Sequence, residues 1–272
     1  MHLDVDELRA FYLSPLGRMV RQIVSGHIRR IWPDLTAMRL LGIGHPTPYF
    51  RPYLGEAERL IALMPAAQGV LHWPPEGPNR TLLAYDHALP LDDQSVDRVL
   101  IVHGLESSND AAALLREVWR VLVPSGRVLV IAPNRAGLWA SSDKTPFGIG
   151  RPYSKGQVCR LVQESMFEPL VTEPLLFLPP TTRRFVLGSA RSWERIGARV
   201  WPRFSGAIAI EAEKQLYQGV LKAKKPRGVK VFVPDLGPAR PAGVASARAL
   251  PRVSAGRQPR RRTRTKTATA VL

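Results

Sequence analysis

The chain has 272 residues, 45% of them hydrophobic, which is enough for one globular domain of roughly 200 residues with extensions. It contains a single cysteine, Cys159, which excludes an intramolecular disulfide and suits a reducing compartment. The formal net charge of +17 is unevenly placed, because residues 226–272 hold 11 Lys and Arg against one acid, Asp235. The overall basicity therefore says little about the folded part of the chain.

The first residues are acidic and lack the apolar core of a secretory signal. The longest apolar runs, such as residues 128–132, are far shorter than the ~20 residues that a membrane helix needs. We therefore expect a cytoplasmic protein without a membrane span.

Two helices are expected at the start of the chain, in a helical segment of residues 1–37. The first covers residues 4–13 and begins near Asp4, which can cap it. The second covers residues 15–31, because Ser14 is a favoured cap and a proline follows it at the first helical position.

Strands and helices then alternate through residues 38–217, which predicts one α/β domain. The expected strands are residues 38–43, 59–64, 81–85, 97–102, 127–133, part of 168–180 and 205–217, with a brief additional strand at 70–73. The expected helices are a short one through residues 50–53, one from the cap Asn109 to residue 122, and two more at 155–165 and 182–201, with a turn at 124–126. Residues 218–272 are basic and rich in Pro, Ala and Arg, so we expect this tail to be disordered.

Residues 82–134 carry the most informative pattern, in which a strand, an acidic residue, a turn, a strand, a helix, a turn and a strand follow one another. The segment LLREVWRVLVPSGRVLVIAPN (114–134) is its most specific part, and LLGIGHPTP (40–48) supplies a glycine-containing loop after the first strand. These segments resemble the class I S-adenosylmethionine-dependent methyltransferases, specifically the methyltransferase type 11 domain, with a degenerate first Gly-rich motif. The resemblance implies a Rossmann-like, doubly wound, mostly parallel seven-stranded sheet whose last strand is antiparallel.

The resemblance also implies S-adenosyl-L-methionine as the cofactor. In the family, glycines after the first strand approach the methionine part, an acid after the third strand receives the adenine amino group, and the end of the fourth strand lines the site. The positions of this sequence that match are Gly42, Gly44, His45, Asp86, His87, His103, Gly104 and Glu106.

Three positions depart from the family pattern. Leu40 replaces the acid that precedes the first loop glycine, and Pro46 replaces the third glycine. Met64 stands where the second strand usually ends in an acid that binds the ribose hydroxyls, a loss of about 1.5–3 kcal/mol per charged hydrogen bond. Glu56 and Glu58 are the nearest acids that could substitute for it.

Methyl transfer from a sulfonium mainly requires alignment of the reactants and exclusion of water. No residue stands out as a general base, and His103 is the candidate. Tyr12, Tyr49 and Tyr153 are candidates to cover a ligand, with core packing as the alternative. No spacing of His, Cys and acids indicates a metal site.

We predict an enzyme that transfers a methyl group from S-adenosylmethionine to an unidentified, small-molecule acceptor. The alternative is a noncatalytic protein of the same fold that acts as a binding partner. The basic tail can contact acidic partners or nucleic acid without specificity, because residues 257–266 carry charge but no aromatic side chains for base stacking. The sequence does not indicate an oligomeric state.

Overall fold

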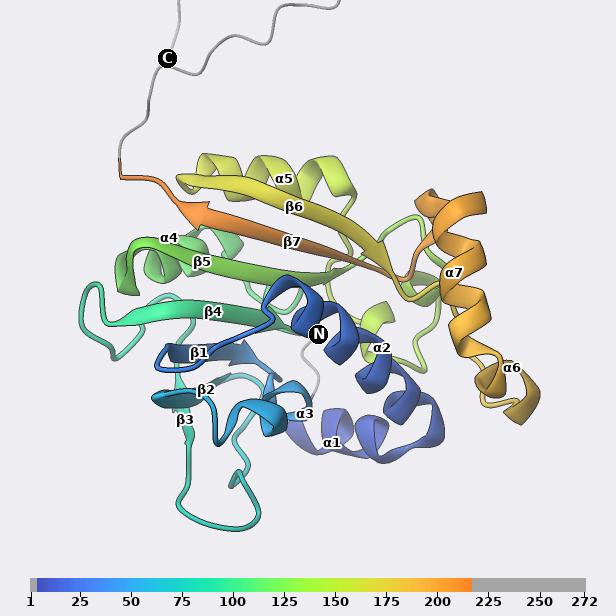
Figure 1. Ribbon diagram of the computed structural model, residues 1–272, viewed down its shortest axis with the longest axis horizontal. Coiled ribbons are helices and arrows are strands. Elements are labelled where there is room, and N and C mark those ends of the chain that lie inside the picture. Colours follow the sequence, from blue (N-terminus) through green and yellow to red (C-terminus); the bar gives the residue numbers. More distant parts are fainter. Residues whose placement is uncertain (1–3, 217–272) are drawn as a thin grey trace, which may run out of the picture. The chain divides into compact units, whose positions relative to one another are not determined.

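A computed structural model describes residues 4–216, which form a seven-stranded sheet with helices on both faces (Figure 1). The strand order is β3-β2-β1-β4-β5-β7-β6. β7 runs antiparallel to both of its neighbours, and the other six strands are parallel to one another. The predicted Rossmann-like fold class is therefore confirmed, while the predicted disorder of residues 218–272 lies outside the described residues.

The strands are close to the predicted ranges. They are β1 (Arg39–Gly44), β2 (Arg59–Pro65), β3 (Thr81–Ala84), β4 (Val96–Val102), β5 (Leu122–Pro133), β6 (Phe167–Leu175) and β7 (Ala207–Lys214). The predicted strand at residues 70–73 is wrong, because this segment is irregular. Pro74 and Pro75 follow it directly, and prolines lack the N–H groups that a strand ladder needs.

The helices are α1 (Val5–Leu13), α2 (Pro15–Ile31), α3 (Thr47–Phe50), α4 (Ala111–Val121), α5 (Lys155–Glu164), α6 (Arg184–Gly188) and α7 (Ala190–Val200). Two expectations about them are wrong. Asp110, not Asn109, caps α4, since its carboxylate accepts from the Ala113 N–H at 2.9 Å. The predicted helix 182–201 is broken at Ser189, beside Gly188, a residue of low helix propensity. None of the helices within residues 4–216 is long and apolar enough to cross a membrane.

The two faces of the sheet bury separate cores. Helices α1, α2, α3, α6 and α7 contribute to the core on one face, and α4 and α5 to the core on the other. Because both faces are covered, the central strands are almost continuously apolar, as the run at 127–133 predicts. The turn expected at 124–126 is a bulge inside β5, where Ser125 has a φ of 59°.

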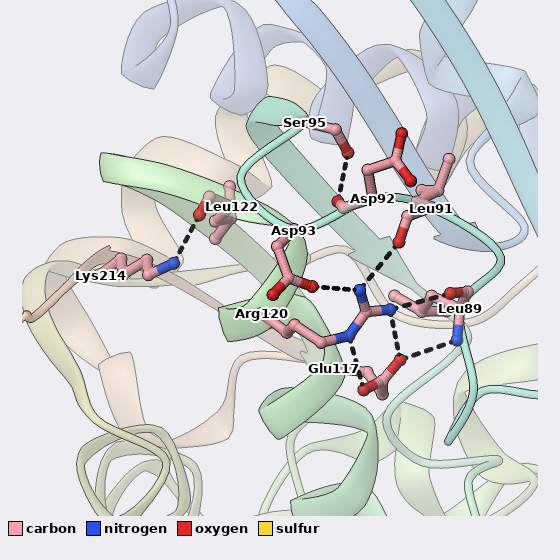
Figure 2. A network of polar contacts seen from close by, with 9 residues as sticks. All are labelled: Leu89, Leu91, Asp92, Asp93, Ser95, Glu117, Arg120, Leu122 and Lys214. Carbon is pink, nitrogen blue, oxygen red and sulfur yellow. Dashed lines mark hydrogen bonds and ion pairs between the residues drawn. The ribbon is translucent and has the colours of Figure 1, made fainter.

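Arg120 fixes the loop between β3 and β4 to helix α4 (Figure 2). Its guanidinium donates to the Glu117 carboxylate at 2.8 and 3.0 Å, to Asp93 at 2.7 Å, and to the carbonyls of Leu89 and Leu91 at 2.9 and 2.8 Å. Glu117 also accepts from the Leu89 N–H at 2.9 Å. The hydrogen bonds to the carboxylates of Glu117 and Asp93 raise the pKa of Arg120, so the guanidinium stays charged. The network connects helix α4 to the loop that leads from the carboxyl edge of the sheet back to the start of β4.

We expect Arg120→Lys to lower the free energy of unfolding by about 1–2 kcal/mol, because a single ammonium cannot reach all five acceptors. Arg116→Lys is the matched control on the same helix, since the one ion pair that Arg116 makes within residues 4–216, to Asp110, is 3.9 Å long and exposed. Urea unfolding of the three proteins measures the difference. Equal losses in the two variants would contradict the structural role of Arg120.

Candidate functional site

The carboxyl ends of β1, β2, β3 and β4 meet at one edge of the sheet, because these four strands are parallel neighbours. In open α/β sheets, ligands bind outside this edge. The segments that end the four strands are residues 44–47, 65–68, 85–87 and 103–110. All predicted cofactor residues lie in these segments except Gly42, which lies deeper in β1.

The two predicted loop glycines have different surroundings. Gly44 has a φ of 91°, and a Cβ atom there would lie 2.2 Å from the Val102 carbonyl oxygen, so only glycine fits. A Cβ at Gly42 would instead meet Pro46 and Phe50, at 2.4 and 2.5 Å. Gly42 therefore lets the chain's own α3 approach the strand, whereas Gly44 lets the ends of β1 and β4 approach each other.

Five polar side chains form a buried group at this edge, which we call the rim cluster: Tyr12, His45, Tyr49, His103 and Glu106. The Tyr12 hydroxyl lies 2.7 Å from the Tyr49 hydroxyl and 2.7 Å from His103 Nε2. His103 Nδ1 lies 3.0 Å from Glu106 Oε1. The ring of Tyr12 stacks on that of His45, with centroids 5.5 Å apart. The rim cluster thus ties α1 and α3 to the loops that follow β1 and β4.

The partners assign the hydrogen positions in the rim cluster. A carboxylate only accepts, so His103 Nδ1 carries the hydrogen toward Glu106. In a neutral imidazole, Nε2 then accepts from Tyr12, which in turn accepts from Tyr49. Burial, together with Tyr49 and Glu106, raises the pKa of Tyr12, and burial also raises that of Tyr49. Both phenols are therefore neutral donors.

His103 is held in an unusual backbone conformation. Its φ is 55°, in the left-handed region that non-glycine residues seldom adopt. Gln68, itself buried, donates its side-chain N–H to the His103 carbonyl at 2.7 Å. On the other side, Phe147 packs edge-on against the His103 ring at 4.8 Å, and Trp139 packs against Phe147. Strained residues held in this way cluster at functional sites.

Two buried polar atoms of the rim cluster have no hydrogen-bond partner within residues 4–216: Glu106 Oε2 and His45 Nδ1. Buried polar groups are nearly always paired with protein, water or ligand. The spare carboxylate oxygen of Glu106 suits a cationic or N–H-bearing ligand group, such as the amino group of a methionine moiety.

The end of β2 offers no charged group to a ligand. Met64 is buried, and its sulfur lies 3.4 Å from the Leu71 N–H. Glu56 and Glu58, considered above as replacements for the missing acid, cannot serve, because both precede β2 and so lie at the opposite edge. Glu56 is also engaged there by Arg29, in two hydrogen bonds of 2.9 Å.

Asp86 borders a cavity of about 280 Å³ between the ends of β2, β3 and β4. Gly104 and Ser108 line it too, and the Ser108 hydroxyl donates to Asp86 Oδ2 at 2.6 Å. His87 is more exposed, with Nδ1 3.3 Å from Asp86 Oδ1. A second cavity, of about 510 Å³, is lined by Tyr12 and His45 of the rim cluster.

The structure thus brings most of the predicted residues to one edge in two groups. His45, His103 and Glu106 are buried in the rim cluster, while Asp86, His87 and Gly104 surround the smaller cavity. Sequence reasoning missed Gln68 and Ser108, each a polar residue shortly after a strand end, which is the signal that could have identified them. Tyr12 and Tyr49 are both in the core, where Tyr12 contacts His103 and Tyr49 contacts Tyr12. Within residues 4–216, no three His, Cys, Asp or Glu side chains are grouped so as to hold a metal.

A model of the methyltransferase domain family matches residues 42–130, from β1 into β5. No curated protein sequence matches the chain. The match covers the glycine-containing loop, the Asp86 segment and the end of β4. S-Adenosylmethionine is the cofactor that this family and fold imply.

Solved structures share the fold at low sequence identity. A SAM-dependent methyltransferase from Thermotoga maritima, described as a possible histamine N-methyltransferase, superposes with a TM-score of 0.55 at 18% identity over 78% of this chain and 96% of that one. A SAM-dependent methyltransferase from Archaeoglobus fulgidus gives 0.52 at 16% identity, over 71% and 94% of the two chains. One from Mesorhizobium loti gives 0.51 at 14% identity, over 70% and 96%.

The burial of His45 predicts a pH dependence of stability. Burial, and then electrostatic interaction with the neighbouring His103 imidazole, lowers the pKa of His45 from the ordinary 6.5 to about 3. Between these values the unfolded chain binds a proton that the folded chain does not. The contribution of His45 to the free energy of unfolding is therefore fully present above pH 6.5. It should decrease as the pH is lowered, by up to ~1.4 kcal/mol per pH unit between about pH 6 and 4.

We expect His45→Gln to flatten this slope, measured by urea unfolding at several pH values. His72→Gln is the control, because His72 is exposed and should leave the slope as it is in the unaltered protein. Parallel slopes for His45→Gln and the unaltered protein would show that His45 does not titrate in this way.

Proposed function

We propose that this protein, which carries a methyltransferase domain of the class I S-adenosylmethionine-dependent family, transfers a methyl group from S-adenosylmethionine to a small-molecule acceptor. The observation that supports this most is the combination, at the carboxyl edge, of the Asp86 cavity with a buried carboxylate oxygen of Glu106 that lacks a partner. A cytoplasmic location is part of the proposal, and the single cysteine is consistent with it.

The residues at the edge fit this cofactor at both of its ends. Asp86 would accept from the adenine amino group, with Ser108 and the Gly104 backbone beside it. Gly44 would leave room for the methionine part, and Glu106 Oε2 would receive its amino group. The ribose would lack a charged partner, because Met64 is buried and apolar. When bound, the cofactor supplies an electrophilic methyl group on a sulfonium.

His103 is the proposed general base. Its Nε2 atom carries no hydrogen of its own and could take a proton once the hydrogen bond from Tyr12 is broken. Glu106, at 3.0 Å from Nδ1, would stabilise the imidazolium that results. Phe147 and Trp139, both buried, would exclude water on the β5 side.

The Tyr12 ring lies between the ends of β1 and β4, in contact with His45 and His103. We propose that this ring moves aside when the methionine part of the cofactor binds. Its movement would break the two hydrogen bonds of the Tyr12 hydroxyl, to Tyr49 and His103, and so weaken binding.

A calorimetric titration with S-adenosylmethionine tests the nucleoside contact. We expect Asp86→Ala to weaken binding about 10- to 100-fold, the effect of losing one charged hydrogen bond. Asp92→Ala is the matched control, an exposed aspartate farther along the same loop. If the unaltered protein does not bind at millimolar ligand, the alternative of a noncatalytic binding protein is favoured.

The same titration tests Tyr12. We expect Tyr12→Ala to bind S-adenosylmethionine about tenfold more tightly, because two hydrogen bonds of about 0.5–1.5 kcal/mol each no longer have to be broken. Circular dichroism confirms that the variant is folded. Unchanged or weaker binding by folded Tyr12→Ala would mean that the ring does not stand in the place of the cofactor.

A further inference from the structure

The larger cavity beside the rim cluster has a volume of about 510 Å³, which is in the range of small-molecule sites. It lies between the end of α1, the start of α3 and residues 71–75. It shares no lining residue with the Asp86 cavity, so the two are distinct.

The walls of this cavity are positively charged. Arg9, Arg21 and Arg51 line it, and no acidic residue does. A groove of about 550 Å³ shares Arg21 and Arg51 with it, adds Arg18, and again has no acidic lining residue. Four arginines, Arg9, Arg18, Arg21 and Arg51, therefore line one region of the surface, formed by α1, α2 and the turn after α3.

These arginines are poorly neutralised by the protein. Among residues 4–216, neither Arg9 nor Arg21 has a hydrogen bond or ion pair. Arg51 has one ion pair, to Glu76 at 3.6 Å, but the two side chains are 69% and 76% exposed. Exposed ion pairs of this kind contribute little free energy. The cavity thus presents positive charge that an anionic ligand would neutralise.

The rest of the lining is apolar or aromatic. Leu13 is 65% exposed at the end of α1, although it is a leucine, and it lines the cavity together with Leu71 and Trp73. An apolar or aromatic ligand body would cover these side chains. Tyr12 and His45 complete the wall toward the rim cluster.

We propose that this cavity binds an amphiphilic anion, a small molecule with an apolar or aromatic body and a carboxylate or phosphate group held by Arg9 and Arg21. Its position against Tyr12, whose hydroxyl lies 2.7 Å from His103, makes it the binding site of the methyl acceptor. That last assignment rests on the proposed methyltransferase function, whereas the anion site itself does not.

Fluorescence titration with 8-anilinonaphthalene-1-sulfonate, an aromatic anion, tests the site without cofactor. We expect Arg9→Gln and Arg21→Gln each to weaken probe binding about tenfold. Arg160→Gln, an exposed arginine on α5 at the opposite face of the sheet, is the matched control and should bind as the unaltered protein does. The neutral probe N-phenyl-1-naphthylamine should not distinguish the arginine variants.

Competition then identifies the anionic group. Octanoate and octyl phosphate should displace the probe while octan-1-ol and octylamine of the same chain length do not, and the better of the two anions distinguishes carboxylate from phosphate. Equal probe affinity in the Arg9, Arg21 and Arg160 variants would overturn the inference.

The calorimetric titration with S-adenosylmethionine separates this inference from the proposed function. Arg21→Gln should bind the cofactor as the unaltered protein does. If it loses cofactor affinity but keeps probe affinity, the arginine serves the cofactor carboxylate and the inference is wrong. If the probe results hold but no protein binds the cofactor, the anion site stands and the methyltransferase proposal fails.

Discussion

The hydrogen bond between the Tyr12 hydroxyl and His103 Nε2 joins the N-terminal helices to the carboxyl edge of the sheet. Through it, α1 covers the ends of β1 and β4, and His45, His103 and Glu106 become buried. Burial in turn keeps His45 and both tyrosines neutral and leaves one oxygen of Glu106 without a partner. The chemistry available at this edge therefore depends on where α1 lies.

The departures from the family pattern form a consistent change in where polar groups stand. At the end of β2 the usual acid is a buried methionine, and at Gly42 the space is filled by Pro46 and Phe50. At the end of β4, by contrast, an imidazole and a carboxylate lie 3.0 Å apart in the protein interior. Charged groups are therefore absent at the end of β2, in residues 65–68, and polar groups are concentrated in the buried group at the end of β4, where low dielectric strengthens each interaction.

The two cavities near the rim cluster differ in the charge of the residues that line them. The smaller has a carboxylate, Asp86, and suits the N–H groups of a nucleobase. The larger is lined by Arg9 and Arg21, which have no ion pair within residues 4–216, and suits an anion. Tyr12 lines the larger cavity and hydrogen-bonds His103, so it is the side chain through which occupants of both would influence each other.

Much of the architecture could be predicted from the sequence, because the backbone conformation of each segment follows from local patterns. The parallel sheet was predicted from the alternation of strands and amphipathic helices and from the apolar run in β5. The segment around Asp86 predicted the edge of the sheet at which the candidate site lies. Tertiary contacts decided the remainder. Tyr12 and His103 are 91 residues apart in the sequence, the neighbours of Gly42 come from α3, and Glu56 turned out to lie at the far edge. Such contacts depend on the direction in which loops send each helix across the sheet, and that direction is set by packing over the whole domain, which no local pattern of residues encodes.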